Sequence, residues 1–157
     1  MARTSGYRKI ASGGHIQAKR MIGCEYCNFM ELANKGKAQF KTGDNCPRCA
    51  SPTLRLYDSK AEFKRAQELK ILRDNDKISD LEFQPKYPLH VVGPDKNEIH
   101  IYDFVPDFQY YDIEKEDTIV EDVKGQSGGK AIVTDVAKMK ISHFEAQYGK
   151  KVLITKR

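Results

Sequence analysis

Asp107, Asp122 and Lys124 form the set of side chains in this sequence best suited to hydrolysis of a phosphodiester. Asp122 and Lys124 lie two residues apart in a run that predicts a strand, so their side chains should project from one face. Carboxylates gathered on a face repel each other unless a cation lies between them, and oxygen ligands favour Mg²⁺ or Mn²⁺. Such an ion activates a bound water, and a nearby lysine can neutralise charge that develops on the phosphate.

The turn between the two predicted strands decides what lies opposite Asp107. A hairpin symmetric about Glu114–Lys115 places Asp107 opposite Asp122, whereas a turn one residue later places it opposite Lys124. Either register brings Asp107 to the same face, because the Cβ atoms of opposite residues are about 4.5–5.5 Å apart. Glu121 points to the other face and would take the acidic role only if the register slips. The alternative is a solvated hairpin that carries a surface Asp–Lys pair.

Four cysteines lie in two close pairs, Cys24 with Cys27 and Cys46 with Cys49, in the pattern C-x2-C-x18-C-x2-C. Two such pairs supply the four thiolates of a tetrahedral zinc site, so the sequence predicts a four-cysteine zinc ribbon over residues 21–53. Disulfides are the alternative, but no export signal indicates an oxidising compartment. A closed four-sulfur shell has no open position, so this zinc should be structural.

Positive charge is concentrated in the N-terminal third of the chain. Residues 1–57 carry ten Lys and Arg against three Asp and Glu, whereas residues 58–157 carry seventeen against nineteen. Residues 1–20 are rich in Gly, Ser and basic residues and predict a basic flexible arm. The excess indicates a polyanionic partner such as nucleic acid. No apolar run is long enough to span a bilayer, so we expect no membrane association and a cytoplasmic location.

Residues 54–157 predict one mixed α/β (α+β) core. Ser59 to Arg73 predicts a helix that begins with the capping box Ser59-Lys-Ala-Glu62, and a second helix should cover Val133–Tyr148 and stop at Gly149. The other predicted elements are short strands at 54–57 and 87–92, an apolar run at 78–83, a long strand over 98–111 interrupted at Pro106, and strands at 118–124 and 151–155. The order is helix, three strands, helix, strand.

The segments Val105-Pro-Asp-Phe108 and Val120-Glu-Asp-Val-Lys-Gly125 resemble the PD-(D/E)XK nuclease superfamily. Three segments, Tyr57-Asp-Ser-Lys-Ala-Glu62, Leu81-Glu-Phe-Gln-Pro85 and 121–125, are more closely similar to a phage-encoded family of small nuclease-like proteins. The resemblance covers about residues 54–155. It implies a restriction-endonuclease-like αβββαβ core, to which the arm and the zinc ribbon are N-terminal additions.

The resemblance also implies roles for single residues. Asp107 and Asp122 would bind Mg²⁺ or Mn²⁺, and Lys124 would be the catalytic lysine. Glu62 matches an acidic residue that often supplies a further metal ligand, although the third position of a capping box also explains a glutamate. Gln84 matches a recurrent glutamine near such sites, with a buried structural amide as the alternative.

The expected function is that of a divalent-metal-dependent DNA endonuclease. The resemblance implies branched DNA, such as a Holliday junction in phage recombination or repair, as one substrate class. Cutting two strands would suit a homodimer with paired sites. The alternative is a non-catalytic zinc-ribbon nucleic-acid adaptor on a degenerate nuclease fold.

Overall fold

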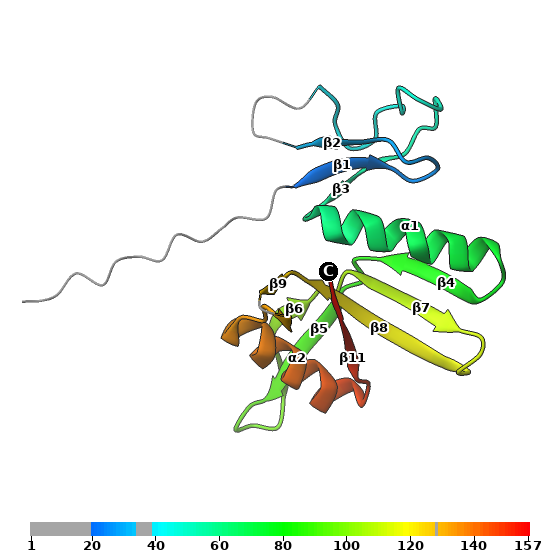
Figure 1. The fold of residues 1–157 in the computed structure, drawn as a ribbon. Coiled ribbons are helices and arrows are strands. Elements are labelled where there is room, and N and C mark those ends of the chain that lie inside the picture. The colour runs from blue at the N-terminus through cyan, green and yellow to red at the C-terminus, as the bar shows by residue number, and fades with distance from the viewer. Residues whose placement is uncertain (1–19, 34–38, 128) are drawn as a thin grey trace, which may run out of the picture.

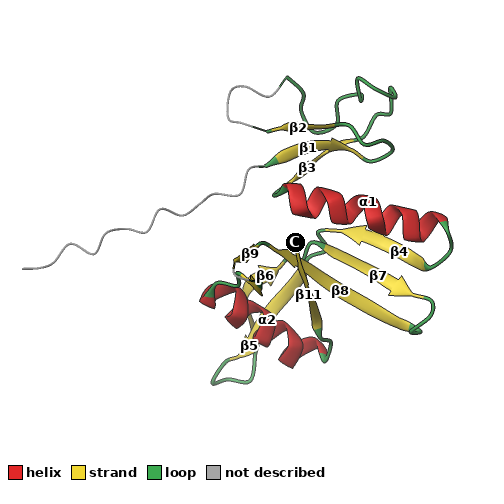
Figure 2. Cartoon of the chain, viewed as in Figure 1, coloured by secondary structure: helices red, strands yellow, loops and turns green. Residues whose placement is uncertain are grey.

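The computed structural model describes residues 20–33, 39–127 and 129–157, so the predicted arm, residues 1–20, lies outside the described residues except for Arg20. The described chain mixes strands with two helices, which confirms the predicted mixed class (Figures 1 and 2). The strands are β1 (Met21–Cys24), β2 (Met30–Leu32), β3 (Leu54–Tyr57), β4 (Ile78–Phe83), β5 (Tyr87–Val92), β6 (Glu98–Phe104), β7 (Phe108–Asp112), β8 (Asp117–Lys124), β9 (Gln126–Ser127), β10 (Lys130–Ala131) and β11 (Val152–Lys156). The helices are α1 (Lys60–Asp74) and α2 (Asp135–Tyr148). Within the described ranges, neither helix is long and apolar enough to cross a membrane.

The main sheet has four strands in the order β11-β8-β7-β4. β4 pairs with β7 and β7 with β8 in antiparallel fashion, whereas β8 and β11 are parallel. A parallel pair needs a crossover connection, and α2 provides it. The chain therefore runs through one helix, three antiparallel main-sheet strands, a second helix and a fourth strand.

The two helices cover opposite faces of the main sheet. On one face, α1 packs Phe63, Ala66 and Leu69 against a cluster that includes Phe108 and Val123. On the other face, Phe144 of α2 packs with Val120 and with Leu89 and Phe104 of the β5–β6 pair. Because side chains alternate along β8, the residues 120, 122 and 124 face the α2 side and 121 and 123 face the α1 side.

Local sequence signals set the bounds of both helices. The Ser59 hydroxyl accepts a hydrogen bond from the Glu62 N–H at 3.0 Å, which confirms Ser59 as the N-cap of α1. Thr134 caps α2 in the same way, and Gly149 ends it in the left-handed conformation, as predicted. Each helix therefore begins and ends within two residues of its predicted bounds.

The predicted long strand over 98–111 is wrong. β6 and β7 belong to different sheets: β6 pairs with β5 in a separate hairpin, and β7 joins the main sheet. The buried Pro106 lies between them, and proline cannot donate a ladder hydrogen bond. The chain changes sheets at Pro106, and β5–β6 is an insertion between β4 and β7.

The predicted boundary between ribbon and core at residues 53 and 54 divides a sheet. β3 pairs with β1 in the three-stranded sheet β2-β1-β3, so the ribbon extends through Tyr57. Tyr57 also packs edge-on against Phe63 of α1, with ring centroids 5.1 Å apart. Figure 1 shows α1 between the ribbon sheet and the main sheet, so one helix supports both.

Lys70 is the one charged residue of α1 that is buried without a hydrogen-bond partner among the described residues. Its side chain lies beside the Phe83 ring, and burial lowers the pKa of its ammonium to about 8. Below about pH 8 the folded protein therefore bears the full cost of a buried charge. That cost disappears as the pH rises from 8 towards the unfolded value of 10.5, because folded Lys70 then loses its proton first.

Lys70→Met should accordingly increase the free energy of unfolding by about 1–3 kcal/mol at pH 7. The gain should shrink as the pH rises above 8, and urea unfolding at several pH values measures it. Lys64→Met, at an exposed position of the same helix, is the matched control and should change little. A K70M variant less stable than wild type at pH 7 would contradict the prediction.

Candidate functional site

The four cysteine sulfurs all lie within 4.8 Å of one another. The Sγ atoms of Cys24 and Cys49 are 3.5 Å apart, and those of Cys27 and Cys46 are 3.6 Å apart. These separations are too long for disulfides. They are close to the edge of about 3.8 Å expected for four sulfurs arranged tetrahedrally at zinc–sulfur distances of about 2.3 Å. The four cysteines can therefore hold a metal ion such as zinc.

Both cysteine pairs have the same local geometry. The N–H of Tyr26 donates to Cys24 Sγ at 3.2 Å, and the N–H of Arg48 donates to Cys46 Sγ at 3.4 Å. Burial opposes ionisation of Cys46, but the backbone donors of Arg48 and Cys49, together with the thiols of Cys27 and Cys24, lower its pKa to about 7. Backbone N–H groups aimed at sulfur stabilise the thiolates that bind metal.

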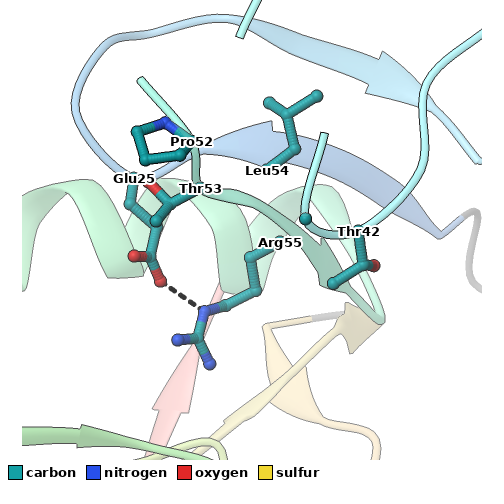
Figure 3. A pocket seen from close by; sticks show the side chains of 7 residues that line it. Glu25, Thr42, Pro52, Thr53, Leu54 and Arg55 are labelled. Carbon is teal, nitrogen blue, oxygen red and sulfur yellow. Dashed lines mark hydrogen bonds and ion pairs between the residues drawn. The ribbon is translucent and has the colours of Figure 1, made fainter. Parts of the chain in front are cut away.

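A pocket of about 280 Å³ lies on the ribbon and contains none of the predicted acidic residues (Figure 3). Its lining includes Glu25 and Arg55, whose ion pair has a separation of 2.5 Å. The Arg55 guanidinium also lies 4.5 Å from the centroid of the Phe83 ring in β4. Arg55 thus pairs with Glu25 within the ribbon and contacts Phe83 of the main sheet. The charged groups that line this pocket therefore already have structural partners.

The β7–β8 register places Asp107 opposite Asp122. Phe108 pairs with Glu121 and Gln109 with Val120, and one further step outward sets Asp107 against Asp122. Of the two registers that the sequence allows, the structure therefore has the one symmetric about Glu114–Lys115. Asp122 and Lys124 therefore face the α2 side at one end of the hairpin, and Asp107 lies at the same end, just before β7.

Contacts hold these three side chains in place. Lys124 Nζ lies 2.7 Å from Asp122 Oδ2, and the Asp122 side chain is largely buried. Asp107 Oδ2 accepts a hydrogen bond from the Val123 N–H at 2.6 Å, so this carboxylate reaches across to the backbone of β8. The local pairing of the hairpin thus brings the acids and the lysine together.

Glu62 and Gln84 lie next to Asp107. Gln84 donates its backbone N–H to the Asp107 carbonyl at 2.9 Å and its side-chain N–H to Glu62 Oε1 at 3.3 Å. Glu62 is 3% exposed, and its other oxygen accepts the Asp58 N–H at 2.6 Å. The predicted capping box is therefore only half formed, because the Glu62 carboxylate bonds Asp58 instead of returning to Ser59.

Burial raises the pKa of two of these carboxylates, those of Asp107 and Glu62. Burial, followed by the charges of Glu62 and Asp122, raises the pKa of Asp107 to about 7, against the opposing effects of the Val123 N–H and Lys124. Burial likewise raises the pKa of Glu62. A cation near these groups would relieve their repulsion.

The acidic groups are less tightly gathered than the cysteines. In the part of the chain that the structure describes, the four cysteines are the one set of three or more potential ligands whose ligand atoms all lie within 4.8 Å. The set formed by Glu62, Asp107 and Asp122 would therefore have to draw closer for all three carboxylates to bind one ion.

Glu121 lies on the opposite face from Asp122 and is fully buried. Its carboxylate accepts hydrogen bonds from Arg65 Nε at 2.7 Å, from the Tyr110 hydroxyl at 2.8 Å and from the Thr155 hydroxyl at 2.6 Å. The slipped register that would bring Glu121 to Asp107 does not occur. Arg65 was not anticipated from sequence, because its partner is 56 residues away and no local pattern marks the pair.

Residues 53–156 match the family described as Protein of unknown function (DUF1064), and the chain belongs to this family. The matched region contains Glu62, Gln84, Asp107, Asp122 and Lys124, whereas all four cysteines precede it. No curated protein and no solved structure matches the chain.

Proposed function

We propose that this DUF1064 protein is a divalent-metal-dependent nuclease that hydrolyses phosphodiester bonds of DNA. The observation that carries the proposal is the convergence of Asp107, Asp122 and Lys124 at one end of the β7–β8 hairpin. Asp107 and Asp122 are largely buried and repel each other, and the pKa of Asp107 stays raised although Lys124 opposes the shift, so a bound cation would relieve the remaining repulsion.

Each residue has a distinct role in this proposal. Asp107 and Asp122 would hold Mg²⁺ or Mn²⁺, with Glu62 as a further ligand, and the bound ion would supply an activated water and polarise the phosphate. Lys124 would orient the attacking water or neutralise charge that develops on the phosphate. Gln84 bonds both Glu62 and Asp107, so it would position the two acids.

The fold supports the same proposal. The order α1, β4, β7, β8, α2, β11, with β8 and β11 parallel and the β5–β6 insertion set aside, supports the proposed restriction-endonuclease-like core. The resemblance to PD-(D/E)XK nucleases rests on the same residues, which lie inside the matched family region. Branched DNA and a homodimer with paired sites remain expectations of that resemblance.

The cysteine cluster would hold structural zinc, because a complete four-sulfur shell has no position for substrate. The Lys and Arg residues of positions 1–57, including those of the ribbon, would add phosphate contacts to the site.

A non-catalytic adaptor is the second candidate. The observation that favours it is that Glu62, Asp107 and Asp122 do not gather as closely as the cysteines do, while Lys124 already neutralises Asp122. An adaptor would bind DNA through the ribbon and would have no need for a metal at the acids.

A cleavage panel separates the two candidates. Purified full-length protein is incubated with labelled junction, flap, single-stranded and duplex DNA in Mg²⁺, Mn²⁺ or EDTA. We expect cleavage of at least one DNA structure with either ion and none in EDTA. Protein that binds these DNAs but cuts none of them with either ion would contradict the nuclease and support the adaptor.

A further inference from the structure

A second lysine lies beside Lys124 on the neighbouring strand. β11 pairs with β8 in parallel, and the register sets Ile154 against Asp122 and Lys156 against Lys124. Adjacent strands are about 4.8 Å apart. Lys156 therefore lies on the strand next to the acidic site, at the same level as Lys124.

Contacts of the flanking residues show which way Lys156 faces. Val152 packs with the cluster of Val120 on the α2 side, whereas the Thr155 hydroxyl donates to Glu121 on the α1 side. Since side chains alternate along a strand, Lys156 shares the α2 side with Val152. This is the face that carries Asp122 and Lys124, and Asp107 lies at the same end of the hairpin.

Lys156 differs from its neighbours in its partners. Lys124 pairs with Asp122, and Arg157 pairs with Glu68, but among the described residues no carboxylate forms an ion pair with Lys156. Lys156 is exposed. An exposed ammonium without an acidic partner, next to a site for phosphodiester chemistry, is free to bind an anion.

We propose that Lys156 binds a backbone phosphate of the DNA strand next to the scissile phosphate and thereby positions the strand over the acids. This inference rests on the proposed nuclease function. Lys124 would act at the reacting phosphate, and Lys156 would act through binding alone, as a positioning residue. A phosphate contact carries no sequence information, so its effect should be the same for every DNA sequence.

The test compares Lys156→Ala with wild type in DNA affinity at several salt concentrations and in cleavage at saturating DNA. We expect affinity to fall by about threefold to tenfold, and the slope of log affinity against log salt to lose about one unit. The cleavage rate at saturation should not change, and Lys156→Arg should restore affinity. Lys150→Ala, an exposed lysine just before the other end of β11, removes the same charge and should leave all three quantities unchanged.

The outcomes separate this inference from the proposed function. Cleavage by wild type, together with a K156A variant that has the affinity and salt slope of K150A, would overturn the role of Lys156 and leave the nuclease intact. A K156A variant that keeps its affinity but loses its rate at saturation would likewise overturn a role in binding. A wild-type protein that cuts no DNA would overturn the proposed function and, with it, positioning over the acids.

Discussion

Cys46→Ser is expected to abolish stoichiometric metal binding and to unfold the ribbon. Cys46 is buried in the ribbon core together with Cys24, Ile22 and Leu54, so it contributes both a ligand and packing. Structural zinc contributes about 10–16 kcal/mol of apparent binding free energy in zinc-finger peptides, and for a small ribbon such binding energy is folding free energy. The strands of β2-β1-β3 have only three or four residues each, so we do not expect their packing to replace this free energy.

The effect should reach beyond the ribbon. Gln67 of α1 donates to the Cys24 carbonyl at 3.1 Å, and Met21 and Tyr57 belong to the same core cluster as Phe63. Loss of metal should therefore also lower the stability of α1.

Metal content per chain and amide hydrogen exchange measure the two effects. We expect one zinc per wild-type chain and none in C46S. In C46S the amide hydrogens of β1 to β3 should exchange fast. Arg48→Ser is the matched control, because Arg48 lies between Cys46 and Cys49 and its side chain is exposed. A C46S variant that retains one tightly held zinc would contradict a four-thiolate site.

The features predicted correctly from sequence are those set by neighbouring residues. Each C-x2-C pair is a local turn, and the need of one metal ion for four thiolates predicted that the two pairs meet. A capping serine and a terminal glycine gave the bounds of α1 and α2 for the same reason. The short hairpin predicted that Asp107 lies near Asp122 and Lys124, but it left two registers open, and the turn selects the one with Asp107 opposite Asp122.

The features that sequence did not predict depend on partners far along the chain. β3 precedes α1 directly, yet it pairs with β1, about 30 residues earlier. Periodicity alone cannot show that β6 and β7 enter different sheets, because both have the composition of strands. The parallel register of β11 on β8, which brings Lys156 beside Lys124, depends on a crossover whose length does not specify the pairing.

The second large expected effect is on the rate of DNA cleavage, after substitutions at Asp122 and Lys124. Asp122→Asn should reduce the rate of DNA cleavage by about 10³-fold or more, because it would remove the charge of a proposed metal ligand while preserving its shape. Lys124→Ala should reduce the rate by about 10²–10³-fold, which corresponds to roughly 3–4 kcal/mol of transition-state stabilisation. Single-turnover cleavage of the substrate found in the panel, in Mg²⁺, measures both.

The protein fold should survive these substitutions. Asp122→Asn removes one of the charges that raise the pKa of Asp107, so the loss of the Lys124 ion pair is offset by weaker repulsion among the acids. We therefore expect a urea midpoint close to that of wild type and unchanged DNA affinity in EDTA. Asp117→Asn, the same change at the other, exposed end of β8, should leave the cleavage rate unchanged.

A structural role for Asp122 and a catalytic role predict opposite combinations of these measurements. If Asp122 only anchors Lys124, D122N and K124A should lower stability together and leave cleavage per folded molecule unchanged. If the two residues act on the phosphate, both variants should stay folded and bound to DNA while the cleavage rate falls. Added Mn²⁺ should then recover part of the cleavage rate of D122N, because it binds the remaining oxygen ligands more readily than Mg²⁺ does. Wild-type rates in both variants would end the assignment of hydrolysis to this hairpin.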